Sequence, residues 1–227
     1  MQASTQELLS FSSPLAYAEI LRSVTDYVIP GRNIVVNMSA SDAWVGAQQS
    51  SALPPFSSTI LVDGRVSGHL LGVFSVQDIP EQEHLARNLG WTDFYGPGED
   101  HPVLLKSVQQ SLGAVEIDKA QALHSPGLGV GDFELKANLW FSPAGTDCGI
   151  HNEHPFIEIH TQISGIGRMQ KFTAKDQTAL YEDQILAPGA TNPVPFCTQQ
   201  PAGFLYPWHQ YKADTDCIWL ALEYHQI

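Results

Sequence analysis

The most informative stretch of the chain is GIHNEHPFIEIHTQISGIGRMQKF, residues 149–172. Successive side chains of a β-strand point to opposite faces. From His154 to Ile163, one face of such a strand carries polar and aromatic side chains, and the other carries mainly aliphatic ones. The aliphatic face predicts packing against another layer. The polar face includes Glu158 and His160, and it must line a solvated cavity or hold a metal, because buried polar groups without partners are costly.

Further metal-ligand types lie close to this strand. His151 and Glu153 come just before it, where a loop could fold them toward the same point, and His209 follows an aromatic-rich turn much later in the chain. Neutral imidazole and carboxylate groups are the usual ligands of Fe(II), Mn(II), Ni(II) and Zn(II). Two histidines and one carboxylate leave coordination positions open. A hydrogen-bonded polar cluster without a metal remains the alternative at this point.

The chain on both sides of this stretch reads as an antiparallel β-barrel or sandwich. A glycine-rich connector, SPGLGVGDF, precedes it at residues 125–133. Five segments, two of them inside the stretch itself, alternate in the way that strands do: LKANLWF (135–141), FIEIHTQI (156–163), RMQKF (168–172), ALYEDQIL (179–186) and CIWLALEYH (217–225).

The N-terminal half predicts a mixture of helices and strands. The spacing of apolar residues and the turn signals predict five elements: a helix over 13–26, a strand over 34–38, a hairpin over 58–76 that turns at Asp63-Gly64, a helix from Pro80 to Gly90, and a helix from Asp100 to Gly113.

Composition excludes several classes of protein. The 227 residues include 11 basic and 24 acidic ones, for a net charge of −13, which disfavours binding to nucleic acids or to anionic membranes. No apolar run approaches the roughly 20 residues of a spanning helix, and no secretory signal is visible. Three widely spaced cysteines argue against a disulfide framework, so we expect a cytoplasmic protein.

The stretch H-N-E-H-P-F-I-E (151–158), followed after six intervening residues by Gly165, resembles the first motif of the cupin superfamily. LYEDQILAPG (180–189) and YPWHQY (206–211) resemble the second motif. The resemblance covers roughly residues 130–227. It implies a mainly β, double-stranded β-helix barrel over 125–227, on which an N-terminal α/β extension, residues 1–124, would pack.

The resemblance also implies a set of metal ligands, namely His151, His154, Glu158 and His209. The chain departs from the family in two places: it has His151-x-x-His154 where the family has H-x-H, and it has Asn192 where a second-motif histidine might stand. The triplet His151-Asn152-Glu153, with His209, resembles instead the facial triad of 2-oxoglutarate-dependent oxygenases. Only Lys212 follows, and it comes too soon to serve as the oxoglutarate-binding cation of that family.

These observations predict a metal-dependent cupin enzyme, with an Fe(II) oxygenase acting on a small organic molecule as the leading hypothesis. Mn, Ni or Zn would fit the same ligands. We predict catalytic roles for His160, as a fifth ligand, a general base or a group that orients a ligand, and for Tyr206 in the pocket wall. A non-redox isomerase or lyase and a non-catalytic small-ligand-binding barrel are the alternatives. By resemblance, we also expect a homodimer.

Overall fold

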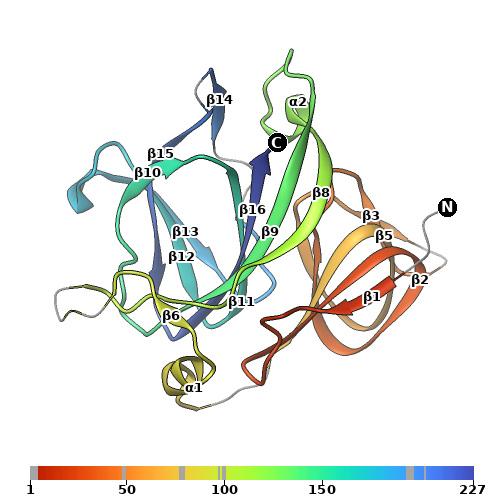
Figure 1. Cartoon of the computed structure of the whole chain (residues 1–227), viewed down its shortest axis with the longest axis horizontal. Coiled ribbons are helices and arrows are strands. Elements are labelled where there is room, and N and C mark those ends of the chain that lie inside the picture. Colours follow the sequence, from red (N-terminus) through yellow and green to blue (C-terminus); the bar gives the residue numbers. More distant parts are fainter. Residues whose placement is uncertain are drawn as a thin grey trace.

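The computed structural model describes residues 5–47, 50–76, 80–96, 98, 101–192, 197–201 and 203–227. The chain folds into two adjoining β-structures (Figure 1), with few helical residues. The elements of the N-terminal part are β1 (Thr5–Leu8), β2 (Ala16–Asn37), β3 (Ala43–Val45), β4 (Ser51–Leu53), β5 (Ser58–Val76), α1 (Gln82–Asn88), β6 (Thr92–Asp93), β7 (Leu105–Lys106), β8 (Gln110–Asp118) and α2 (Lys119–Ala122). Neither α-helix of the described residues is long and apolar enough to cross a membrane.

The C-terminal part contains most of the strands that form the second barrel, which β6, β7 and β8 also join. They are β9 (Val130–Ser142), β10 (His151–His154), β11 (Ile157–Ser164), β12 (Gly167–Phe172), β13 (Leu180–Leu186), β14 (Thr198–Gln200), β15 (Gly203–Ala213) and β16 (Cys217–Gln226), with a short 3₁₀ helix (Gln177–Ala179) before β13. The predicted strands over 135–141, 156–163, 168–172, 179–186 and 217–225 are confirmed.

Two long strands, β2 and β5, dominate the N-terminal part and curl into a small barrel. They pair along most of their length. Ile34, near the end of β2, pairs with Ile60 near the start of β5 and also with Phe74 near its end, so the two strands close on themselves. The predicted helix over 13–26 is therefore wrong. Its apolar residues belong to a strand whose alternation is interrupted where Ser23 and Asp26 adopt positive φ angles of 51° and 53°.

The predicted hairpin at Asp63-Gly64 is also wrong, because β5 runs straight through this dipeptide. Asp63 has a φ of 47°, but it lies beside Gly31 of β2, whose φ is 66° and whose N–H donates to Asp63 Oδ1 at 2.7 Å. The positive φ angles at Gly31 and Asp63 bend both strands at the same point, and β5 does not reverse its direction there.

The two helices predicted after β5 have different outcomes. The helix from Pro80 to Gly90 is confirmed as α1. The helix predicted as far as Gly113 is wrong: its start, Asp100, lies outside the described residues, and the chain up to Gly113 forms β7 and the beginning of β8. The N-terminal part is therefore mostly β, and the α/β character expected for it is not confirmed.

The C-terminal barrel consists of two sheets with the strand order of a double-stranded β-helix. One sheet has the order β11-β16-β9-β7-β6, with β8 also paired to β9, and the other has the order β10-β15-β12-β13. Along the chain, β9, β11 and β16 enter the first sheet, while β10, β12, β13 and β15 enter the second. This alternation between sheets is the jelly-roll pattern.

The aliphatic face predicted for β11 is confirmed as a buried layer. Ile157 and Ile159 of β11 form one hydrophobic cluster with Ile34 and Phe74 of the N-terminal barrel and with Leu222 of β16. The opposite face of the same sheet points into the C-terminal barrel, because side chains alternate along each strand. The N-terminal barrel thus covers the outside of the sheet whose inside carries Glu158 and His160.

Among the hydrogen bonds that join the two barrels, a fully buried one has a loss that can be measured. The Tyr224 hydroxyl donates to Met38 O at 2.9 Å, and both residues are fully buried. Tyr224→Phe leaves that carbonyl unpaired, so we expect a loss of about 1–2 kcal/mol in the free energy of unfolding, measured by urea denaturation. Tyr181, which is exposed, provides the control: Tyr181→Phe should change stability by less than about 0.5 kcal/mol. Equal effects of the two changes would contradict this account.

Candidate metal centre

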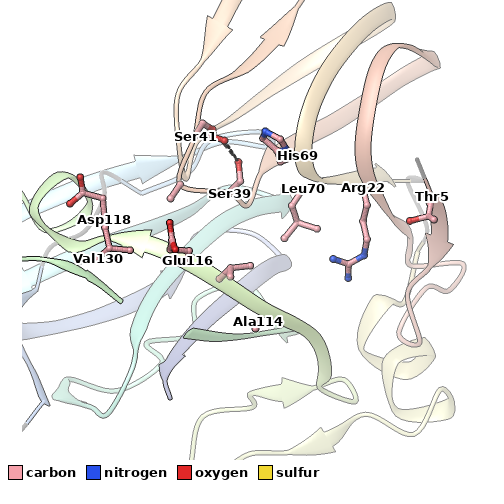
Figure 2. Close-up of a pocket in the computed structure, with 12 residues that line it drawn as sticks. Thr5, Arg22, Ser39, Ser41, His69, Leu70, Ala114, Glu116, Asp118 and Val130 are labelled. Carbon is pink, nitrogen blue, oxygen red and sulfur yellow. Dashed lines mark hydrogen bonds between the residues drawn. The ribbon is translucent and has the colours of Figure 1, made fainter. Parts of the chain in front are cut away.

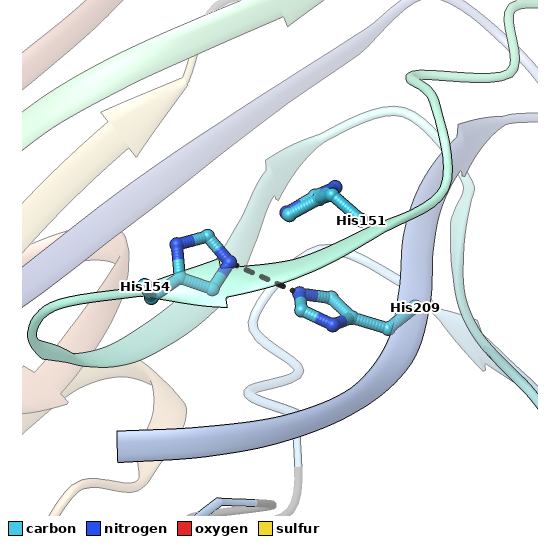
Figure 3. A group of neighbouring side chains, drawn as sticks. All are labelled: His151, His154 and His209. Atoms are coloured by element: carbon cyan, nitrogen blue, oxygen red, sulfur yellow. Dashed lines mark hydrogen bonds between the residues drawn. The ribbon is translucent and has the colours of Figure 1, made fainter. Parts of the chain in front are cut away.

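Three histidines converge inside the C-terminal barrel (Figure 3). His151 and His154 lie on β10, and His209 lies on the neighbouring strand β15 as the direct cross-strand partner of His151. One nitrogen from each ring lies within 4.8 Å of the others. His209 is fully buried and the other two are half-buried.

An irregularity in the sheet makes this convergence possible. In a regular strand, residues three apart point to opposite faces, so His151 and His154 would not meet. The pairing of β10 with β15 shifts between His151 and Glu153, and both rings turn toward His209 as a result. Glu153 is exposed and lies outside the cluster, so the described geometry does not assemble a His151-x-Glu153 triad.

The hydrogen bonds of two rings direct their Nε2 atoms toward the centre. His151 Nδ1 lies 2.9 Å from Gly149 O, and His209 Nδ1 lies 2.9 Å from Pro207 O. A carbonyl oxygen only accepts, so each Nδ1 carries the proton and each Nε2 keeps its lone pair. Metal-binding histidines are commonly held by such a bond from the other ring nitrogen.

Burial keeps the three imidazoles neutral. It lowers the pKa of His154 to about 3, and that of His209 to about 3, with the neighbouring His151 adding to both effects. Burial also lowers the pKa of His151. Neutral imidazole is the form that binds a metal, so no proton has to be removed from these rings at neutral pH.

The spacing of the cluster fits a single divalent cation. His154 Nε2 and His209 Nε2 are 3.3 Å apart. Two nitrogens that each lie about 2.1 Å from one ion, at an angle of roughly 100°, are about 3.2 Å apart. The residues present therefore fit the metal that the resemblance implies.

Glu158 and His160 approach the cluster from β11, in the facing sheet. Glu158 Oε2 lies 3.5 Å from His154 Nε2, and Glu158 Oε1 lies 3.6 Å from His160 Nε2. Burial, together with a smaller contribution from the nearby carboxylate of Glu223, raises the pKa of Glu158 to about 8, and Lys106 partly opposes the shift. Burial holds the pKa of His160 well below its ordinary value. Glu158 therefore lies beside His154, but it is not one of the groups whose ligand atoms all lie within 4.8 Å of one another, so its role as a fourth ligand stays a prediction.

The structure places the hydroxyl of Tyr206 on the backbone between β10 and β11. The Tyr206 hydroxyl accepts from Glu158 N–H at 2.8 Å and donates to Phe156 O at 2.9 Å. Its ring centroid lies 4.8 Å from that of His154. Tyr206 therefore fixes the point where the chain crosses from one sheet to the other, and with it the position of Glu158.

The structure also brings residues to the site that the sequence analysis did not select. Glu223 of β16 is the direct cross-strand partner of Glu158, and Lys106 Nζ lies 3.7 Å from Glu223 Oε1. Asn138 of β9 lies on the same face of the sheet, two strands from His160. Nothing in the local sequence marks these residues, because only the strand order places them beside β11.

A separate hollow lies outside the barrel, between the N-terminal barrel and β8 (Figure 2). It has a volume of about 620 Å³, and its lining includes Arg22, His69 and Glu116. His69 and Glu116 are exposed, and Arg22 donates to Leu112 O at 2.8 Å. None of the three clustered histidines lines this hollow.

The strand order of the two sheets defines a cupin-like, double-sheet jelly-roll barrel, and the histidine cluster inside it is a candidate metal site. The predicted mainly β, cupin-like barrel is therefore confirmed, and β6, β7 and β8, from before residue 125, join its sheet as well.

Comparison with known proteins gives matches to solved structures alone. No protein-family model matches the sequence, and no curated protein matches it. A cupin 2 conserved barrel domain protein from Leptotrichia buccalis is similar over 98% of this chain and 89% of its own, with 10% identity and a TM-score of 0.30. Bacillus subtilis oxalate decarboxylase, a protein with Mn(II) centres, is similar over 93% of this chain and 69% of its own, with 14% identity and a TM-score of 0.31. At these scores, the fold assignment rests on the strand order itself.

Proposed function

We propose that this protein is an Fe(II)-dependent cupin oxygenase that acts on a small organic molecule. The observation that carries the proposal is the convergence of three neutral imidazoles, two of which have Nδ1 bonded to a carbonyl and Nε2 directed inward. His151, His154 and His209 would hold the metal, with Glu158 as the fourth ligand. Mn(II), Ni(II) and Zn(II) fit the same donors.

A bound Fe(II) would supply the redox chemistry with dioxygen. The chain's own residues hold and orient the reactants and exclude water, since His209, Glu158 and His160 are all buried. Glu158 would bind the metal as a carboxylate, and the neutral His160, whose Nε2 lies 3.6 Å from Glu158 Oε1, can accept a proton at the reacting centre. Tyr206 is a positioning residue, because its hydroxyl is bonded to Glu158 N–H.

The same pair of residues supports a second candidate function, a non-redox isomerase or lyase. Glu158 and His160 form a buried acid–base pair beside the cluster, and such a pair can move a proton while a metal polarises the substrate. Oxygen consumption separates the two candidates: an oxygenase consumes dioxygen with its substrate, and an isomerase or lyase does not.

Metal content tests both functions against a non-catalytic barrel. We expect purified protein to bind about one divalent ion per chain, measured by inductively coupled plasma mass spectrometry. Glu158→Gln keeps the shape of the side chain but removes the charge, and it should weaken binding at least about 100-fold, because losing an outer-shell group alone costs roughly 10- to 100-fold. A folded wild type that binds no metal after incubation with Fe(II), Mn(II), Ni(II) or Zn(II) would contradict the proposal.

Two expectations from the sequence stay predictions, namely homodimerisation and a cytoplasmic location. Light scattering of the purified protein measures the first: a mass of about twice the 24.9 kDa of one chain would confirm it. Fractionation of the cells that make the protein measures the second.

A further inference from the structure

The inner face of the sheet β11-β16-β9-β7 carries a second group of polar side chains beyond the candidate ligands. Cross-strand partners share a face of the sheet. His160 of β11 pairs with Ala221 of β16, which pairs with Asn138 of β9. Asn138 and His160 therefore flank a small alanine on the face that also carries Glu158.

Asn138 has a buried donor without a partner. The residue is fully buried, and Gln109 Nε2 donates to Asn138 Oδ1 at 3.3 Å, which fixes the orientation of the amide. Asn138 Nδ2 has no hydrogen-bond acceptor among the described residues. Buried polar groups are nearly always hydrogen-bonded. The unpaired Asn138 Nδ2 therefore indicates that a bound molecule supplies its acceptor.

Two more donors lie at the same end of this face. Trp140 is two residues beyond Asn138 on β9, and its Nε1 is also buried without a partner among the described residues. Lys106 of β7 is the cross-strand partner of Trp140, and its Nζ lies 4.9 Å from the centre of the Trp140 ring. Lys106 Nζ is 3.7 Å from Glu223 Oε1, which is too long for a hydrogen bond.

These donors are connected to the candidate metal centre through two carboxylates. Lys106 approaches Glu223, Glu223 is the cross-strand partner of Glu158, and Glu158 lies 3.5 Å from His154. Glu223 is also held on its other side, since His225 Nε2 lies 3.0 Å from Glu223 Oε2. The end of this face at β11 and β16 thus carries the two carboxylates beside the histidines. The end at β9 and β7 carries the ammonium group of one lysine and the side-chain N–H groups of Asn138 and Trp140.

We infer that the substrate carries a carboxylate group, which binds to Lys106 Nζ, Asn138 Nδ2 and Trp140 Nε1 while the rest of the molecule extends toward the three histidines. A group of donors that includes one cation, and two members of which have no acceptor, matches the oxygens of an anion. This inference rests on the proposed function, because it names the substrate class of the same site.

The test uses metal-free protein, prepared with a chelator, so that it does not depend on the metal. Phenylacetate and hexanoate are titrated against the wild type by isothermal calorimetry, alongside their uncharged amides, phenylacetamide and hexanamide. We expect at least one of the two carboxylates to bind at least about tenfold more tightly than its amide, because a charge-assisted hydrogen bond contributes that much. Lys106→Gln should abolish this preference, and Asn138→Leu should reduce the affinity for the carboxylate about fivefold or more.

Lys212→Gln is the matched control. Lys212 lies on β15, on the face opposite His209, and pairs with Asp147 at 3.1 Å, so its replacement should leave the carboxylate preference unchanged. The inference is wrong if neither carboxylate binds, if carboxylates and amides bind alike, or if Lys106→Gln retains the preference. Lys106 is partly exposed, so its variant should fold even where Asn138→Leu does not. A wild type that selects carboxylates but binds no metal would contradict the metal proposal alone.

Discussion

Replacing His209 with alanine is expected to abolish stoichiometric metal binding. His209 Nε2 lies 3.3 Å from His154 Nε2, and its Nδ1–H is held by Pro207 O. Loss of this ring removes one of three converging nitrogens, so we expect the affinity for a divalent ion to fall roughly 1,000-fold, beyond the 10- to 100-fold cost of losing an outer-shell group. Calorimetric titration of chelator-treated protein with Mn(II) or Zn(II) measures the change.

The control for this variant is His69→Ala. His69 is exposed on β5 and lines the separate hollow of Figure 2, away from the cluster. Its replacement should leave the affinity for metal unchanged. His209→Gln provides a bulkier replacement in case the alanine variant does not fold, and circular dichroism verifies the fold of both. Wild-type affinity in a folded His209 variant would rule out the three-histidine site.

Replacing Gly165 with alanine is expected to destabilise the protein by about 2–5 kcal/mol. Gly165 lies in the turn between β11 and β12 with a φ of 74°, which costs a residue with a side chain roughly 1–2 kcal/mol. A Cβ there would also overlap the backbone oxygen of Asp216 and would lie 2.9 Å from Thr215 Oγ1. Backbone would have to move to relieve this overlap, which adds about 1–3 kcal/mol.

Gly145 separates these two contributions. It has a similar φ of 80°, but an added Cβ would meet nothing within 4 Å. Gly145→Ala should therefore cost only the backbone term, about 1–2 kcal/mol. Thermal unfolding measures both variants, and the Gly165 variant should melt roughly 10 °C below the wild type. A Gly165→Ala variant as stable as the Gly145→Ala variant would show that the turn can relax.

The C-terminal strands could be predicted from the sequence because their two faces differ sharply. Ile157 and Ile159 face the N-terminal barrel, while Glu158 and His160 face inward, so the alternation is visible in the residues themselves. The strand β2 could not be recognised in the same way. Positive φ angles at Ser23 and Asp26 interrupt its period, and the residues around them then fit a helical spacing equally well.

Some residues of the candidate site could be predicted from the sequence, and others could not. His151, His154, Glu158 and His160 are neighbours in sequence, and residue type alone marks them as possible ligands. Lys106, Asn138 and Glu223 come from three different strands, and the pairing of β7, β9 and β16 brings them together. Strand order depends on contacts across the whole barrel, so the local sequence could not identify these residues.

The position of β16 has a consequence for how the chain matures during synthesis. This strand follows every other described strand in sequence, yet it lies in the middle of its sheet, between β11 and β9. Until the ribosome has released residues 217–226, the facing edges of β9 and β11 have no partner, and unpaired edges invite association with other chains. The nascent protein therefore passes through a stage in which the small N-terminal barrel can already form while the metal-facing sheet stays open.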